Sequence, residues 1–144
     1  MIAVDTNLLV YAHRGESPFH RAARACVQHL AEGPADWAIP WPCIHEYLGM
    51  VTHPRIYKPP TPVQAAIEQI ESWLECPNLV LLAETAGYWD RLREIAAAGN
   101  VSGGRVHEAR IAAICTLHGV KELWSADRDF SRFPGLKVRN PLIG

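Results

Sequence analysis

Short apolar runs of strand length alternate with helical segments along this chain, and this alternation restricts the fold more than any other feature. Four such runs stand out, at residues 1–5, 36–41, 78–83 and 121–127, and residues 136–140 are a candidate for a short edge strand. Strands separated by helices are typical of a parallel sheet with helices on both faces. We therefore predict a three-layer α/β/α fold with a central, mainly parallel sheet of four to five strands.

Capping and stop signals set the expected ends of the helices. The pairs Ser17-Pro18 and Thr61-Pro62 place a capping hydroxyl before a proline, which suits the first turn of a helix. Gly33, Gly99 and Gly119 are expected stops. The predicted helical segments are residues 6–12, 16–33, 42–53, 61–75, 86–99 and 104–119.

Length and composition favour one folded domain, residues 1–144. Hydrophobic residues make up 49% of the chain and charged residues 20%, a balance typical of globular proteins. The apolar runs are much shorter than the roughly 20 residues of a membrane-spanning helix. The N-terminal residues lack the basic and apolar regions of a signal peptide. We therefore expect a cytoplasmic protein without a membrane segment.

The four cysteines are far apart in the sequence, at Cys26, Cys43, Cys76 and Cys115. A zinc site or redox motif normally has closely spaced cysteines, so we expect buried, reduced thiols. His13, His45 and His53 are also too irregularly spaced to indicate a zinc site.

Basic residues are concentrated near the C-terminus, although the net charge of −1 does not indicate nucleic-acid binding by the whole molecule. Half of the 14 lysines and arginines lie between residues 105 and 139. This region is either a solvated face or a surface that contacts phosphates. The candidate contacts are Arg110, Arg128, Arg132 and Arg139.

Two aspartates follow apolar runs at the ends of predicted strands. Asp5 ends the first run and Asp127 the fourth, with Asp129 in the same turn. In parallel α/β sheets, functional groups gather beyond the carboxyl ends of the strands. Asp5 has an alternative role as the cap of the helix that begins near residue 6, although Thr6 and Asn7 are also suited to it.

Two glutamates lie early in predicted helices, among small or apolar neighbours. Glu46 falls in the second turn of its helix, and Glu108 heads a stripe formed with Ile111, Ala112 and Cys115. An interaction with the helix dipole, about 0.3–1 kcal/mol, would explain an acid in the first turn. This interaction would not explain why Glu108 lies on the buried face of its helix.

Converging carboxylates repel one another, and a bound divalent cation removes that conflict. Mg²⁺ and Mn²⁺ prefer oxygen ligands and commonly serve phosphate chemistry. The acids therefore predict a metal-dependent hydrolase that acts on a phosphate ester. A phosphatase of the D-x-D type is disfavoured because "DTNLL" lacks the second aspartate.

Three segments resemble the PIN-domain ribonucleases, in the order found in that family. "VDTNLLVYA" resembles the start of the domain, "HEYL" the segment with its glutamate, and "VHEARIAAICTLHGVKELWSADRDFSRFPGLKVRNPL" the C-terminal half of VapC toxins of toxin–antitoxin pairs. The resemblance covers essentially the whole chain. It implies a PIN-like fold and cleavage of RNA with Mg²⁺ or Mn²⁺. It also implies homodimers that assemble with a VapB-type antitoxin as their inhibitor.

The resemblance also assigns roles to residues. It implies catalytic carboxylates at Asp5, Glu46, Glu108 and Asp127, of which Asp5, Glu108 and Asp127 would bind the metal. Thr6, Asn7 and Asp129 would support the site, and Arg110, Arg128 and Arg132 are candidates for contacts with RNA.

Position 108 departs from the family pattern, which usually has aspartate there. The alternative function is therefore a catalytically weakened PIN-fold module that binds RNA or a protein partner.

Two other features have less specific interpretations. We expect His107 to point to a different helix face from Glu108, as a surface or structural residue. The tryptophans fall mostly at core-like positions. Trp37 and Trp41 have an alternative role, lining a groove for bases or for an antitoxin helix.

Overall fold

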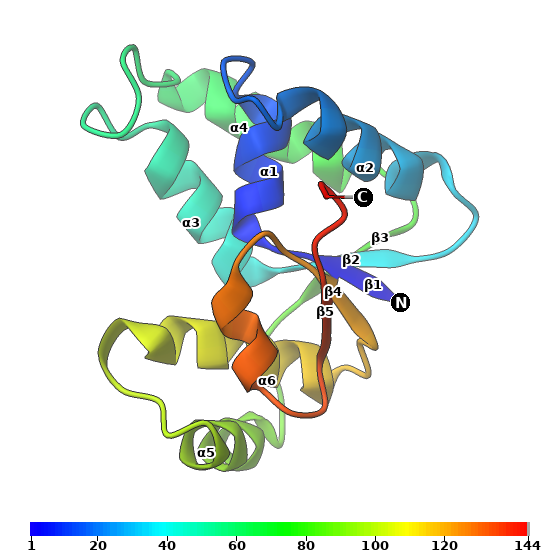
Figure 1. Cartoon of the computed structure of the whole chain (residues 1–144). Coiled ribbons are helices and arrows are strands. Elements are labelled where there is room, and N and C mark those ends of the chain that lie inside the picture. The colour runs from blue at the N-terminus through cyan, green and yellow to red at the C-terminus, as the bar shows by residue number, and fades with distance from the viewer. Residues whose placement is uncertain (144) are drawn as a thin grey trace.

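A parallel five-stranded sheet forms the centre of the molecule, in the order β3-β2-β1-β4-β5 (Figure 1). The computed structural model describes residues 1–143, apart from the side chains at positions 131 and 132. All five predicted strands are present, the fifth at the edge. Their bounds are β1 Ile2–Val4, β2 Trp37–Pro40, β3 Leu79–Leu82, β4 Glu122–Trp124 and β5 Lys137–Arg139.

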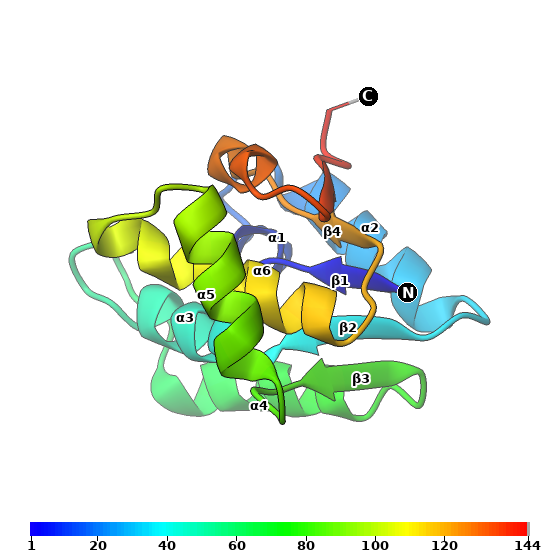
Figure 2. The same ribbon diagram turned by 90° about the horizontal axis from the view of Figure 1, so that it is seen from below.

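Helices cover both faces of this sheet, which confirms the predicted three layers. Helices α1, α2 and α4 lie on one side and α5 and α6 on the other (Figures 1 and 2). The helices are α1 Thr6–His13, α2 His20–Glu32, α3 Trp41–Val51, α4 Val63–Leu74, α5 Tyr88–Ala98 and α6 Val106–Leu117. Two short 3₁₀ helices, η1 Gly103–Arg105 and η2 Arg128–Arg132, precede α6 and β5.

Strand β1 is the central strand, and the strand order reverses beside it. It pairs with β2 through Ile2 and Trp37, and with β4 through Ile2 and Glu122. The chain passes from β1 to β2 and β3 on one side, and then to β4 and β5 on the other. In open α/β sheets, ligands bind at such a reversal, beyond the carboxyl ends of the strands.

Two helices begin later than their capping signals predict. α2 starts at His20 instead of residue 16, and α4 starts at Val63 with no side-chain cap. The Ser17 hydroxyl accepts a hydrogen bond from the Phe19 backbone N–H within a turn. The Thr61 hydroxyl likewise does not cap α4. It contacts His13, the last residue of α1, and Arg14, the residue after it.

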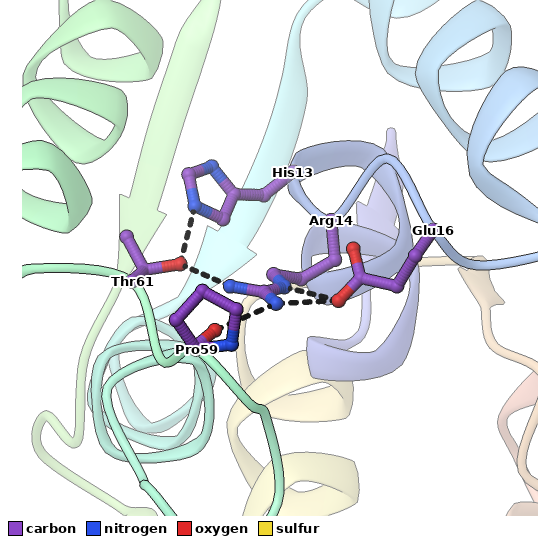
Figure 3. A network of polar contacts seen from close by, with 5 residues as sticks. All are labelled: His13, Arg14, Glu16, Pro59 and Thr61. Carbon is purple, nitrogen blue, oxygen red and sulfur yellow. Dashed lines mark hydrogen bonds and ion pairs between the residues drawn. The ribbon is translucent and has the colours of Figure 1, made fainter.

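These contacts fasten the α3–α4 connection to the end of α1 (Figure 3). Arg14 donates hydrogen bonds of 3.0 Å to the Thr61 hydroxyl and to the Pro59 carbonyl, and of 2.8 Å to Glu16. His13 Nε2 lies 3.1 Å from the same Thr61 hydroxyl. The Pro-rich segment is thus held to the body of the protein by specific polar contacts.

The core lies between the sheet and its helices and contains aliphatic residues from both layers. Cys43 and Cys115 are buried within it, as predicted, whereas Cys26 and Cys76 are only half-buried. The described cysteines form no disulfide. Among residues 1–143, the helices fall short of the length and apolar character needed to cross a membrane.

Candidate functional site

A cavity of about 500 Å³ opens where the strand order reverses, at the carboxyl end of β1. All four acids expected to be catalytic line it, together with Thr6 and Asn7. The lining residues are Asp5, Thr6, Asn7, Glu46, Met50, Gly104, His107, Glu108, Ile111, Asp127 and Phe130. These residues come from α1, α3, η1, α6 and the segment after β4, so the fold gathers acids that lie far apart in sequence.

Asp5 is the most deeply buried of these acids, with 4% of its surface exposed. Its carboxylate accepts hydrogen bonds from the Thr6 backbone N–H at 2.8 Å and from the Ser125 hydroxyl at 2.7 Å. The contact with Thr6 shows that Asp5 does cap α1, as the alternative interpretation held. Burial raises the pKa of Asp5, the charges of Glu46 and Asp127 add to this rise, and the two hydrogen bonds oppose it, so that the pKa is about 6.

Thr6 and Asn7 connect the first turn of α1 to other parts of the site. The Thr6 hydroxyl donates a hydrogen bond of 2.8 Å to Glu46 on α3. The Asn7 side-chain carbonyl accepts one of 3.2 Å from the backbone N–H of Ala126, just after β4. These are polar contacts of the kind expected of supporting residues.

Ser125 is a member of the site for which the sequence predicted no role. Its buried hydroxyl donates to Asp5 and accepts a hydrogen bond of 2.9 Å from the Asp127 backbone N–H. It therefore links the carboxyl ends of β1 and β4. The signal in the sequence is a small polar residue directly after the apolar pair at the end of β4, two positions before Asp127.

Asp127 also belongs to a cluster of three carboxylates. Glu108, Asp127 and Asp129 each present an oxygen within 4.8 Å of the others. Asp127 also accepts a hydrogen bond of 2.9 Å from the Asp129 backbone N–H, which fixes the turn at the start of η2. Asp129, expected only to support the site, thus lies in the cluster. Asp5 connects to this cluster through Ser125.

Glu108, the member of this cluster from α6, has about a fifth of its side chain exposed. Burial is the main cause that raises the pKa of Glu108, and the charges of Asp127 and Asp129 add to this rise. Arg105 opposes this shift, since its Nε lies 3.4 Å from Glu108 Oε2. Glu108 Oε2 is buried without a hydrogen-bond partner among the described residues.

The arginines expected to contact RNA occupy different positions. Arg110 pairs with Glu84 and does not line the cavity. Arg128 is exposed on η2, next to Asp127. The side chain of Arg132 lies outside the described residues. Arg139, the remaining candidate for phosphate contacts, is exposed over the ring of Trp124.

The structure also places His107 and the tryptophans. His107 is exposed, as expected of a surface residue, and it lines the same cavity as Glu108. Trp37 is fully buried and donates a hydrogen bond of 3.3 Å to Asn78, so it lines no groove. Trp41 is 39% exposed, and Trp89, at 65%, departs from the core-like pattern.

The donors of the three-acid cluster suit a hard divalent cation. All three are carboxylates, the ligands that Mg²⁺ and Mn²⁺ prefer. The buried Glu108 oxygen has unused acceptor capacity, which is costly in a buried site unless a cation or a donor satisfies it. The residues present therefore fit a metal ion.

A family model described as the PIN domain matches residues 2–136. The chain belongs to the PIN-domain family. This PIN domain is 34% identical over 140 residues to ribonuclease VapC48 of Mycobacterium tuberculosis, with 97% of each chain covered. It is 31% identical over 144 residues to ribonuclease VapC43 of the same organism, covering 100% of this chain and 97% of the relative.

Solved structures show the same PIN-domain fold. The toxin VapC20 of M. tuberculosis, described as cleaving the sarcin–ricin loop, matches with a TM-score of 0.70 at 17% identity, over 97% of this chain and all of that one. VapBC2 of Rickettsia felis, bound to a promoter DNA fragment, matches with a TM-score of 0.70 at 18% identity, over 97% and 98% of the two chains.

Proposed function

We propose that this PIN domain is a metal-dependent endoribonuclease that acts as the toxin of a toxin–antitoxin pair. In this proposal it hydrolyses RNA phosphodiester bonds at the acidic cavity and so inhibits translation and growth. The observation that carries the proposal is the convergence of acids from the end of β1, from α3, from α6 and from the segment between β4 and η2 in one cavity. Identity above 30% with VapC ribonucleases along nearly the whole chain supports it.

Glu108, Asp127 and Asp129 would hold Mg²⁺ or Mn²⁺, and Asp5, the further metal ligand that the resemblance implies, is linked to Asp127 through Ser125. When bound, the cation supplies charge stabilisation to the phosphodiester and lowers the pKa of a water molecule. Asp5 and Glu46 keep the cavity negative. The Thr6 hydroxyl, which donates a hydrogen bond of 2.8 Å to Glu46, would hold that carboxylate in place at the cavity. RNA would approach over Arg128, with Arg110 and Arg132 as further candidate contacts.

The proposed partners are a VapB-type antitoxin and a second copy of the chain, in the cytoplasm. Two of the similar solved structures are described as VapBC2 of R. felis on promoter DNA and a toxin–antitoxin complex from Klebsiella pneumoniae. An antitoxin segment that covers the cavity would block both the acids and the approach of RNA.

Cleavage of RNA by the purified chain, with and without Mn²⁺, tests this function. We expect cleavage that requires Mn²⁺ or Mg²⁺, stops in excess EDTA and is abolished in Asp5→Ala. We expect Glu108→Asp to remain active, because it keeps a carboxylate, and Glu108→Ala to lose about a hundredfold in rate. Undiminished activity of Asp5→Ala, or activity in EDTA, contradicts the proposal.

A second candidate function is a module that binds RNA or a protein without cleaving. The observation that favours it is Glu108 itself, which stands where the family usually has aspartate and lies 3.4 Å from Arg105. The Glu108 variants separate the two functions. If wild type, Glu108→Asp and Glu108→Ala bind RNA but are equally inert, the binding module is correct.

A further inference from the structure

Arg105, at the end of η1, lies against the acidic cluster, but one of its hydrogen-bond donors has no partner among the described residues. Its Nε is 3.4 Å from Glu108 Oε2, and its Nη2 is 3.4 Å from the Asp129 carbonyl oxygen. Its guanidinium also lies 5.9 Å from the centre of the Phe133 ring. Both Arg105 Nε and Glu108 Oε2 are buried atoms with no hydrogen-bond partner among the described residues. Arg105 and Glu108 thus form an ion pair in which these two atoms lie too far apart or too poorly aligned for a hydrogen bond.

The cluster needs positive charge whether or not a metal ion is present. One oxygen from each of three carboxylates lies within 4.8 Å of the others, and Asp5 is linked to Asp127 through Ser125, so like charges repel one another here. The Arg105 guanidinium, with its Nε 3.4 Å from Glu108 Oε2, brings a positive charge to this cluster. In the metal-free protein, Arg105 thus does part of what a divalent cation would do.

We propose that Arg105 is an internal counter-ion of the acidic cluster, which neutralises Glu108 in the metal-free protein and competes with the divalent cation for it. Arg105 thereby sets the metal concentration at which the nuclease becomes loaded. The inference rests on the proposed function. The geometry supports exchange: a bidentate Arg–carboxylate pair holds its partner in two parallel hydrogen bonds, whereas Arg105 Nε and Glu108 Oε2 lie 3.4 Å apart without a hydrogen bond.

The length of the Glu108 side chain makes this competition specific. Arg105 and Glu108 are three residues apart across the start of α6, so their side chains lie on one face. An aspartate at position 108 is shorter by one C–C bond, about 1.5 Å, and its carboxylate would withdraw from the guanidinium. The effect of Arg105 on metal binding therefore depends on the glutamate.

Mn²⁺ binding measured by calorimetry tests the competition directly, without any cleavage assay. Removing a unit positive charge about 6 Å from a divalent ion strengthens ion binding by about tenfold at the dielectric constant of water. We therefore expect Arg105→Gln to lower the Mn²⁺ dissociation constant by about threefold to tenfold. Arg105→Lys, which keeps the charge, should stay within about twofold of wild type. In Glu108→Asp, the added Arg105→Gln change should have a smaller effect.

Thermal unfolding provides a second readout that a purely structural role would not produce. Arg105→Gln should melt at a lower temperature than wild type without metal, and at nearly the same temperature with saturating Mn²⁺, because the ion replaces the lost charge. The matched control is Arg93→Gln, which removes an arginine that pairs with Asp90 at the same i,i+3 spacing, 3.3 Å away on α5. This control should leave Mn²⁺ affinity unchanged.

Unchanged or weaker Mn²⁺ binding in Arg105→Gln overturns the inference, as does an equal loss of melting temperature with and without metal. The outcomes also separate the inference from the proposed function. If wild type binds Mn²⁺ and Arg105→Gln changes this binding as described, but wild type cleaves no RNA, the proposed nuclease function is contradicted and the counter-ion role of Arg105 is retained. Wild type that cleaves RNA while Arg105→Gln binds Mn²⁺ normally contradicts the counter-ion alone.

Discussion

The Ser125 hydroxyl donates a hydrogen bond of 2.7 Å to the Asp5 carboxylate, and both side chains are buried. The same hydroxyl oxygen accepts the backbone N–H of Asp127. One small side chain thus joins the carboxyl ends of the two central strands, and it links the most buried acid of the cavity to the acids that can hold a metal ion.

Replacing Ser125 with alanine should weaken both stability and activity. Loss of a hydrogen bond to a buried charged group costs about 1.5–3 kcal/mol in free energy of unfolding. The loss should be larger at pH 8, where Asp5 is ionised, than at pH 5, where it is largely protonated. Because the Asp127 turn is also released, we expect RNA cleavage to fall by about tenfold. Denaturant unfolding at both pH values and a cleavage assay measure these effects.

Ser72→Ala is the matched control for this change, because Ser72 is exposed on α4. It should behave as wild type in both assays. Equal stability of Ser125→Ala and wild type at pH 8 would show that the hydrogen bond to Asp5 contributes nothing to the free energy of unfolding.

The raised pKa of Asp5 predicts how stability depends on pH in the metal-free protein. The pKa is about 6 in the folded state and 3.8 without the perturbation. The folded state therefore binds the proton more tightly than the unfolded state does. The contribution of Asp5 to stability is fully present below the lower value and is lost as the pH rises to about 6 and above. The loss amounts to about 3 kcal/mol.

Asp5→Asn should lack this loss, because the amide does not ionise. Denaturant unfolding of the metal-free proteins measures this effect. As the pH rises from 4 to 7, we expect the free energy of unfolding of Asp5→Asn to increase relative to that of wild type. A difference that stays constant over that range would contradict the raised pKa.

The contacts of Thr61 predict a stability effect remote from the acidic cavity. Thr61→Val removes the hydroxyl that accepts a hydrogen bond from Arg14 and contacts His13 (Figure 3). Leaving a partly buried donor unpaired costs about 1–3 kcal/mol in free energy of unfolding. Cleavage measured well below the melting temperature should be unchanged. Glu16→Gln, which changes an exposed partner of Arg14, should cost less than about 1 kcal/mol.

The predictable part of this structure follows from chain order. Alternating strands and helices define a parallel sheet, and parallel strands bring their carboxyl ends to one edge. Asp5 and Asp127 follow neighbouring central strands, so their proximity could be predicted from the sequence. Glu108 could be placed near them because it heads the buried stripe of its helix.

The unpredicted part depends on tertiary contacts that no local pattern encodes. Thr61 has the sequence of a helix cap, but its hydroxyl bonds to Arg14 from a segment 47 residues earlier. The importance of Asp129 and Arg105 depends on how η2 folds back against η1, where the Asp129 carbonyl meets the guanidinium. Ser125 was missed because a single serine directly after a strand gives only a weak signal.

The most direct test of the central claim is RNA cleavage by wild type and Asp127→Asn across a titration of Mn²⁺. Asp127 belongs to the three-acid cluster and is also tied to Ser125, and asparagine keeps the oxygen that accepts the Asp129 N–H. We predict cleavage that rises with Mn²⁺ in wild type, is absent in EDTA and is slower by about a hundredfold in Asp127→Asn. Cleavage at equal rates in the two proteins, or in EDTA, would contradict the claim that this acidic cluster is a metal-dependent nuclease site.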